Sequence, residues 1–143
     1  MDHASETETN EGNLQGSGER ILLVDDDPAI LEALKTILGI YGYTVFCAFD
    51  AANALVLFEK EKRSFDLLFT DVTLPVTTGI ELAEKILLLR PDMPVLLGSG
   101  YMNEESVSFI TKGKRYPFVS KPYETEGLLR TIKKLLKSTS TRG

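Results

Sequence analysis

The chain contains few of the residues on which several classes of protein depend. Its single cysteine, Cys47, cannot form an internal disulfide and is expected to be a small buried apolar residue in a reducing cytoplasm. Its single histidine, His3, lies in a polar terminal segment, which excludes catalytic or metal sites built from histidine. No apolar run approaches the roughly 18 residues of a membrane span, and no basic start followed by an apolar stretch marks a secretion signal.

The composition predicts one acidic domain with a polar leading segment. The chain has 143 residues, of which 43% are hydrophobic, and this is enough for a buried core. Its formal net charge of −5 argues against direct nucleic-acid binding. Residues 1–20 are rich in Glu, Ser, Thr, Asn and Gly, so they are predicted to be a disordered tail or linker. The domain is expected over residues 21–138, with a frayed C-terminus over 139–143.

Five short apolar runs alternate with five segments of helical periodicity. Strands are predicted at residues 21–24, 44–48, 67–70, 95–97 and 118–119. Helices are predicted from residue 28 to about 39 or 42, from 51 to about 62, from 79 to about 89 and over 103–112. A last helix is predicted by the apolar stripe within residues 128–136, and it is expected to fray from residue 138. Because strands and helices alternate, the expected fold is α/β, with a doubly wound sheet of five parallel strands and five helices.

Aspartates follow two of the predicted strands. The first strand runs into Asp25-Asp26-Asp27-Pro28, and the third runs into Asp71. Clustered carboxylates beside apolar strands are costly unless something compensates their charge. A hard divalent cation such as Mg2+ prefers oxygen ligands and keeps waters that a phosphate can replace. Asp27 alone is interpreted as a helix cap, because it precedes a proline.

Two more polar side chains follow the fourth and fifth strands, namely Ser99 and Lys121. Ligands of doubly wound sheets bind beyond the carboxyl ends of the strands. A carboxylate pair, a third carboxylate, a hydroxyl and an ammonium are therefore expected to meet at one edge of the sheet.

Residues from Glu19 to about Lys137 resemble the receiver domain of bacterial two-component response regulators. The similarity is carried, in order, by residues 21–28 (ILLVDDDP), 71–75 (DVTLP) with Gly79, 94–100 (PVLLGSG), and Lys121-Pro122. It implies a flavodoxin-like sheet with strand order 2-1-3-4-5. It also implies a signalling function, in which a histidine kinase or histidine phosphotransfer protein donates a phosphoryl group to an aspartate. That reaction requires Mg2+ or Mn2+, and it changes the partner-binding surface of the domain.

The resemblance assigns roles to the acidic residues. Asp71 matches the aspartate that accepts the phosphoryl group. Asp25 and Asp26 match the acidic pair that holds the metal ion, Asp26 directly and Asp25 through water. Thr73, two residues after the acceptor, matches the position that offers a backbone carbonyl to the metal.

The resemblance also assigns roles on the last two strands. Ser99 matches the hydroxyl residue that meets the phosphoryl group, and Lys121 matches the family's lysine, whose bond to Pro122 is expected to be cis. Phe118 matches the aromatic residue whose ring reorients with Ser99 on activation. Tyr101 is expected to overhang the pocket and to slow hydrolysis of the phosphoryl group.

One residue departs from the family pattern in the fourth strand. Gly98 stands where a bulkier apolar residue is usual, and the strand is expected to be looser there.

Three other functions share part of this pattern with a working receiver. A haloacid-dehalogenase-type Mg2+ phosphatase would use Asp25 as nucleophile and Asp27 as acid and base. That function requires a later acidic motif and a cap over the pocket, which the sequence does not offer, and it leaves Asp71 without a role. A flavin carrier would need a phosphate-binding loop where the aspartates lie. A degenerate receiver would only bind partners.

Two architectures fit a receiver of this length. One is a free-standing receiver, and the other is the C-terminal receiver of a hybrid histidine kinase, which the sequence of residues 16–20 (GSGER) slightly favours. The oligomeric state stays open.

Overall fold

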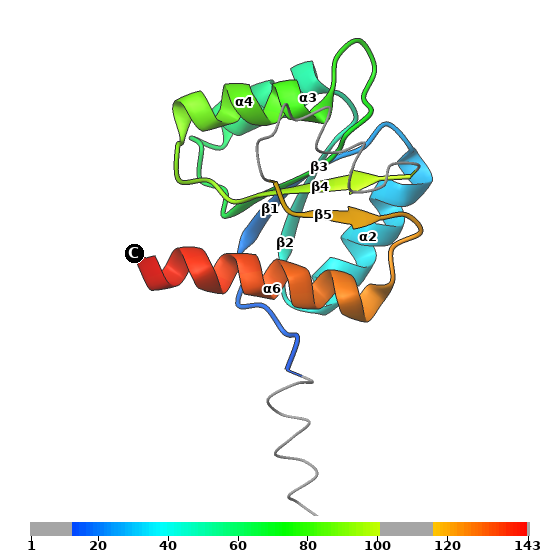
Figure 1. Cartoon of the computed structure of the whole chain (residues 1–143), viewed down its shortest axis with the longest axis vertical. Coiled ribbons are helices and arrows are strands. Elements are labelled where there is room, and N and C mark those ends of the chain that lie inside the picture. The colour runs from blue at the N-terminus through cyan, green and yellow to red at the C-terminus, as the bar shows by residue number, and fades with distance from the viewer. Residues whose placement is uncertain (1–12, 101–115, 143) are drawn as a thin grey trace, which may run out of the picture.

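Five parallel strands form one sheet in the order β2-β1-β3-β4-β5, which confirms the predicted topology (Figure 1). The structure is a computed structural model and describes residues 13–100 and 116–142. The strands are β1 (Arg20–Val24), β2 (Thr44–Ala48), β3 (Leu67–Asp71), β4 (Val95–Ser99) and β5 (Phe118–Ser120). Because the order reverses direction after β1, the carboxyl ends of β1 and β3 meet at the switch point of the sheet.

Four helices cover the sheet within the described residues. They are α2 (Pro28–Ile40), α3 (Ala51–Lys60), α4 (Gly79–Leu89) and α6 (Thr125–Arg142). Helices α3 and α4 lie on one face, and α2 and α6 lie on the other (Figure 1). The helix predicted over 103–112 lies outside the described residues. Helix α6 continues past the predicted end at residue 138.

Local sequence signals set the helix starts. The Asp27 carboxylate accepts a hydrogen bond from the Ala29 backbone N–H, with Pro28 in the first turn, so its predicted capping role is confirmed. Asp50 caps α3, and Thr78 caps α4 in the same way. Asp27 therefore belongs to the start of α2, unlike its neighbours Asp25 and Asp26, which do not cap a helix.

The two faces of the sheet form two apolar cores. Leu22 and Leu68 pack towards α3 and α4, whereas the alternate residues Leu23 and Phe69 pack towards α2 and α6. All four side chains are almost completely buried. The strands are thus apolar on both faces, as expected for a covered parallel sheet.

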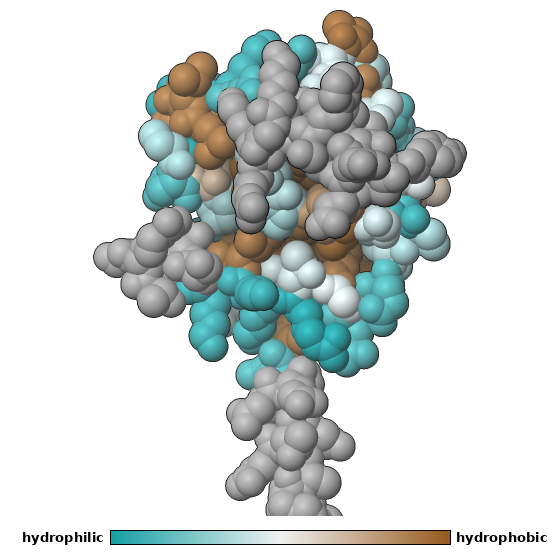
Figure 2. Space-filling view, in the orientation of Figure 1, coloured by the Kyte–Doolittle hydropathy of each residue, from teal (hydrophilic) through white to brown (hydrophobic). Residues whose placement is uncertain are grey.

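The apolar stripe of α6 belongs to the core. Leu128, Leu129 and Ile132 are at most 3% exposed, against the sheet face shared with α2. The opposite surface of the helix is hydrophilic (Figure 2). The contrast between its two sides explains why the helix docks in one orientation.

Residues 14–18, which precede the boundary predicted at residue 21, contact the domain. The Gly16 and Gly18 backbone N–H groups donate hydrogen bonds to the Tyr41 and Gly42 carbonyls at 2.6 and 2.7 Å. Leu14 is buried in the core beside α2 and α6. The expectation of a disordered tail considered only composition, whereas these contacts depend on backbone groups.

Cys47 is only half buried, because it lies on β2, an edge strand of the sheet. Burial still raises the pKa of its thiol above the ordinary value, with Lys35 opposing the shift. Among the described residues, no helix combines the length and apolar character needed to cross a bilayer.

Candidate functional site

The acidic residues meet where β1 and β3 end. The two strands pair in parallel with Val24 opposite Thr70, so the next residue of each strand, Asp25 or Asp71, lies beside the other. Carboxylate oxygens of Asp25, Asp26 and Asp71 all lie within 4.8 Å of one another. The predicted convergence is therefore present.

The three carboxylates differ in exposure. Asp25 and Asp71 are 2% and 8% exposed, while Asp26 is exposed. The Asp25 carboxylate accepts a hydrogen bond from the Asp27 backbone N–H at 2.9 Å, which fixes its orientation. Two buried carboxylates, with a third that solvent can reach, suit a hard divalent ion that enters from solvent and keeps some of its water ligands. The donor set therefore fits Mg2+ or Mn2+.

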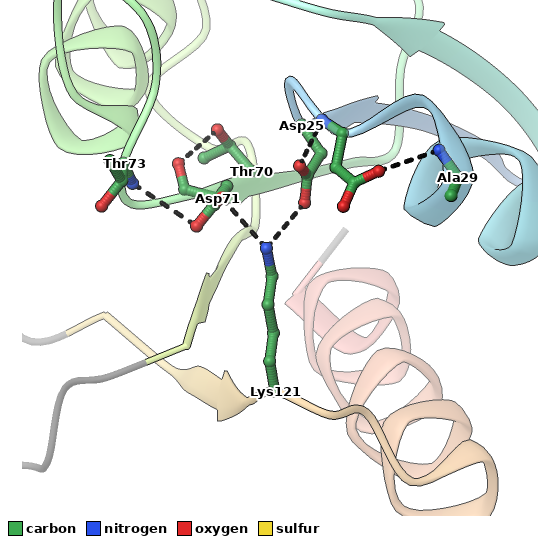
Figure 3. A network of polar contacts seen from close by, with 7 residues as sticks. Asp25, Ala29, Thr70, Asp71, Thr73 and Lys121 are labelled. Carbon is green, nitrogen blue, oxygen red and sulfur yellow. Dashed lines mark hydrogen bonds and ion pairs between the residues drawn. The ribbon is translucent and has the colours of Figure 1, made fainter.

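Lys121 supplies the positive charge that the cluster needs. Its Nζ atom lies 3.0 Å from Asp25 Oδ2 and 3.1 Å from Asp71 Oδ2 (Figure 3). The side chain reaches the site from the segment after β5, whose Lys121-Pro122 bond is cis, as predicted. The Lys121 backbone N–H donates to the Ser99 carbonyl at 2.7 Å, so the segment is fixed to the end of β4.

The ionisation of this group follows from burial and charge. Burial raises the pKa of the Asp71 carboxyl, and the hydrogen bond and charge of Lys121 oppose that rise without cancelling it. Burial alone would lower the pKa of Lys121, but its hydrogen bonds to Asp25 and Asp71 outweigh burial and raise it. The contacts with both carboxylates thus favour the charged form of the lysine.

The loop after β3 closes tightly on Asp71. The Gly79 backbone N–H donates to the Val72 carbonyl at 2.7 Å, and the Thr73 backbone N–H approaches Asp71 Oδ1 at 3.4 Å (Figure 3). A β-carbon at position 79 would overlap the Asp71 carbonyl oxygen and lie 3.0 Å from its carbon. Glycine is required there because the backbone of the loop passes directly over the end of β3.

The remaining predicted residues have different positions. Ser99 is buried at the end of β4, next to the segment that carries Lys121. Phe118 is half buried and packs against the core under α3 and α4. Tyr101 lies outside the described residues. The roles assigned to these three residues stay predictions.

Sequence reasoning missed one contact of the site, between Gly98 and Tyr123. A β-carbon at Gly98 would overlap the Tyr123 hydroxyl oxygen and lie 3.0 Å from Cζ of the same ring. The tyrosine thus fills the space that the glycine leaves. A glycine inside a strand is a known sign of close approach by another group, so the signal was present.

A groove of about 780 Å³ opens beside the acidic cluster. It is lined by residues of α2 and of the segment 121–123. The α2 residues that line it are Ile30, Ala33, Leu34 and Ile37. Because Asp26 and Asp71 also line this groove, a ligand or partner bound in it would lie next to the carboxylates.

The chain matches the description "Response regulator receiver domain" over residues 21–133. It belongs to this family. The sequence is 33% identical over 121 residues to the response regulator MprA of Mycobacterium ulcerans, and the match covers 84% of this chain and 51% of that protein. It is also 29% identical to the transcriptional regulatory protein ZraR of Salmonella typhimurium, with 86% of this chain and 27% of that protein covered. The receiver therefore spans about half or less of these relatives.

A crystal structure of a CheY-like response regulator receiver domain protein from Methanospirillum hungatei is similar in fold. It superimposes with a TM-score of 0.79 and 38% sequence identity, covering 89% of this chain and all (100%) of that one. Receiver domains are phosphoacceptor signalling domains of two-component systems, and the expected function class is thereby confirmed. These relationships do not favour the haloacid-dehalogenase alternative.

Proposed function

We propose that this receiver accepts a phosphoryl group on Asp71 from a phosphohistidine of a histidine kinase or histidine phosphotransfer protein. The observation that supports it most is the Asp71 carboxylate, held 3.1 Å from the Lys121 ammonium and beside two further carboxylates. In the transfer, an Asp71 oxygen forms a bond to phosphorus while the bond from phosphorus to the imidazole nitrogen breaks. The electron pair of that bond stays on the imidazole.

Asp25, Asp26, Asp71 and the Thr73 carbonyl are the groups that would hold the Mg2+ or Mn2+ ion. When bound, the ion supplies positive charge that offsets the repulsion between a carboxylate and a phosphoryl group. The fit rests on three carboxylates whose oxygens lie within 4.8 Å of one another. Hard oxygen donors of this kind are the ligands that these ions prefer.

The chain's own residues supply positioning and charge. Lys121 keeps a fixed positive charge beside Asp71, which offsets the repulsion between the carboxylate and the oxygens of the incoming phosphoryl group. Ser99 offers a hydroxyl at the end of the neighbouring strand. No general base is needed, because the reactive form of Asp71 is the carboxylate itself and no proton leaves it. Catalysis by positioning and electrostatics is what phosphoryl transfer requires.

The groove along α2 is proposed to receive the donor protein. Ala33 and Ile37 present an apolar surface that leads to the acidic cluster. A helix that carries the phosphohistidine could bury apolar side chains there while its imidazole faces Asp71.

The proposal includes the wider behaviour of the domain. The receiver promotes its own phosphorylation and dephosphorylation and is not a turnover enzyme. Ser99 and Phe118 rearrange after transfer, and Tyr101 slows hydrolysis. It does not contact nucleic acid directly, and it acts in the cytoplasm.

The test is phosphorylation by acetyl phosphate with and without Mg2+, followed by mass spectrometry and mapping of the acyl phosphate. Asp71→Asn is expected to abolish labelling. Asp27→Asn is the matched control, because asparagine caps a helix as well as aspartate does and the position adjoins the site. Labelling that persists in D71N, or that maps to Asp25, would refute the proposal.

A further inference from the structure

Tyr123 lies two residues after Lys121, and its ring packs against the acceptor strand β3. Its ring packs on Phe69 of β3, with ring centres 5.4 Å apart and an angle of 60° between the planes. Its hydroxyl occupies the space where a side chain at Gly98 of β4 would lie. The ring is therefore in contact with two adjacent strands of the sheet.

The register of the sheet places this hydroxyl beside the acceptor. Gly98 is the partner of Asp71 in the β3–β4 pairing. Paired residues of parallel strands are about 4.8 Å apart and point to the same face. The vacant side-chain position of Gly98 thus adjoins the Asp71 side chain. In agreement, burial first, and then the charges of Asp71 and Asp25, raise the pKa of the Tyr123 phenol.

The segment 121–123 is consequently fixed at two points to the end of β4. The Lys121 backbone N–H donates to the Ser99 carbonyl at 2.7 Å, and the Tyr123 hydroxyl sits against Gly98. The Lys121 side chain begins between these two points and extends to Asp25 and Asp71. A displacement of Tyr123 would therefore move the origin of this side chain.

We infer that Tyr123 is a positioning residue that holds Lys121 at the acceptor by lodging its hydroxyl in the empty side-chain position of Gly98. The inference rests on the proposed function and extends it to two residues outside the acidic cluster. It predicts that the sizes of residues 98 and 123 are matched. It also predicts that disturbing the match has opposite effects on phosphorylation and on cation binding.

The opposite effects follow from the double contact of Lys121. When its Nζ atom leaves Asp25 and Asp71, phosphoryl transfer loses a fixed positive charge and slows. The same change frees two carboxylates from their internal cation, so Mg2+ binds more tightly. A variant that only damaged the fold would weaken both.

The experiment compares the full chain with Gly98→Ala, Tyr123→Phe and the double variant. Phosphorylation by acetyl phosphate gives the rate, and calorimetric titration gives the Mg2+ affinity. Gly98→Ala is expected to slow phosphorylation on the order of tenfold, since displacements near 1 Å have effects of this size or larger, and to tighten Mg2+ binding. The double variant should recover part of the rate, because loss of the oxygen removes the severe overlap and leaves a β-carbon 3.0 Å from Cζ, which a ring shift of a few tenths of an ångström relieves. Gly39→Ala is the matched control, since a β-carbon there meets open space.

Tyr123→Leu removes the ring and the hydroxyl without adding atoms at position 98, so it tests the inference even if Gly98→Ala does not fold. It should also slow phosphorylation and tighten Mg2+ binding. Unchanged rate and affinity in both Gly98→Ala and Tyr123→Leu, or a double variant as slow as Gly98→Ala, would overturn the inference. If wild type itself takes no phosphoryl group on Asp71, the proposed function fails instead, and the two failures are distinct.

Discussion

Replacing Lys121 by methionine removes the internal cation of the acidic cluster and keeps most of the side-chain volume. The variant leaves Asp25 and Asp71, which are 2% and 8% exposed, without the ammonium that each now contacts. We expect three results together: lower stability without Mg2+, tighter Mg2+ binding, and slower phosphorylation.

The magnitude follows from the two contacts at 3.0 and 3.1 Å. At an effective dielectric constant of about 20, each charge pair attracts by roughly 5 kcal/mol before desolvation is counted. Breaking a buried pair by removing one partner costs about 3–5 kcal/mol after desolvation. Because the Lys121 side chain is 21% exposed, the lower end applies, and the free energy of unfolding should fall by about 3 kcal/mol.

Urea unfolding in EDTA and at saturating Mg2+ measures this effect. The deficit of the variant should shrink when Mg2+ is added, because tenfold tighter binding adds about 1.4 kcal/mol at saturation. Lys85→Met is the matched control, since Lys85 is an exposed lysine on α4. Equal stability of Lys121→Met and wild type in EDTA, together with an unchanged Mg2+ affinity, would refute the electrostatic account of the site.

Three further predictions concern the surroundings of the site. Ala33→Glu places charge in the groove along α2, so it should lower the rate of transfer from a phosphohistidine protein far more than the rate from acetyl phosphate. The exposed Ala52→Glu on α3 is the control. Equal losses of rate with both donors would contradict the role of the groove. Gly79→Ala should cost about 1–3 kcal/mol of stability in urea unfolding and slow phosphorylation, because its β-carbon displaces the Asp71 carbonyl; a wild-type rate would count against the loop geometry. Burial and the charge of Glu19 raise the pKa of Tyr43 to about 12. The stability that this gives is present below about pH 10 and is lost as the pH rises to about 12. Wild type should therefore lose about 2 kcal/mol more than Tyr43→Phe over that interval, and equal losses would contradict this account.

The convergence of the acidic residues could be predicted because it depends only on strand order. Parallel strands end at one edge, so Asp25 and Asp71 lie close once β1 and β3 are neighbours, and the long side chain of Lys121 reaches them from the end of β5. The helix cap at Asp27 could be predicted for a similar reason, since it is a local signal next to a proline.

Other features depend on contacts that composition does not encode. Residues 13–19 are polar and glycine-rich, yet the Gly16 backbone hydrogen-bonds to Tyr41, and Leu14 enters the core. The placement of Tyr123 against Gly98 required the path of the chain after Lys121, which no periodicity reveals. The sequence thus predicts which residues lie at the end of a strand, but it does not predict how a loop packs against a strand.

The location of Asp71 on the central strand has a consequence for how a signal leaves the domain. Strand β3 is flanked by β1 and β4. Asp71 itself pairs with Gly98 of β4, and the preceding Thr70 pairs with Val24 of β1, so the backbone at the acceptor cannot shift without disturbing the strand pairing. The loop 72–79 and the segment 121–123 lie beyond the ends of these strands, so a change in either does not require strand pairs to break. The nucleophile thus stays in place when it is phosphorylated. A partner must therefore detect phosphorylation through changes in the segments that surround Asp71.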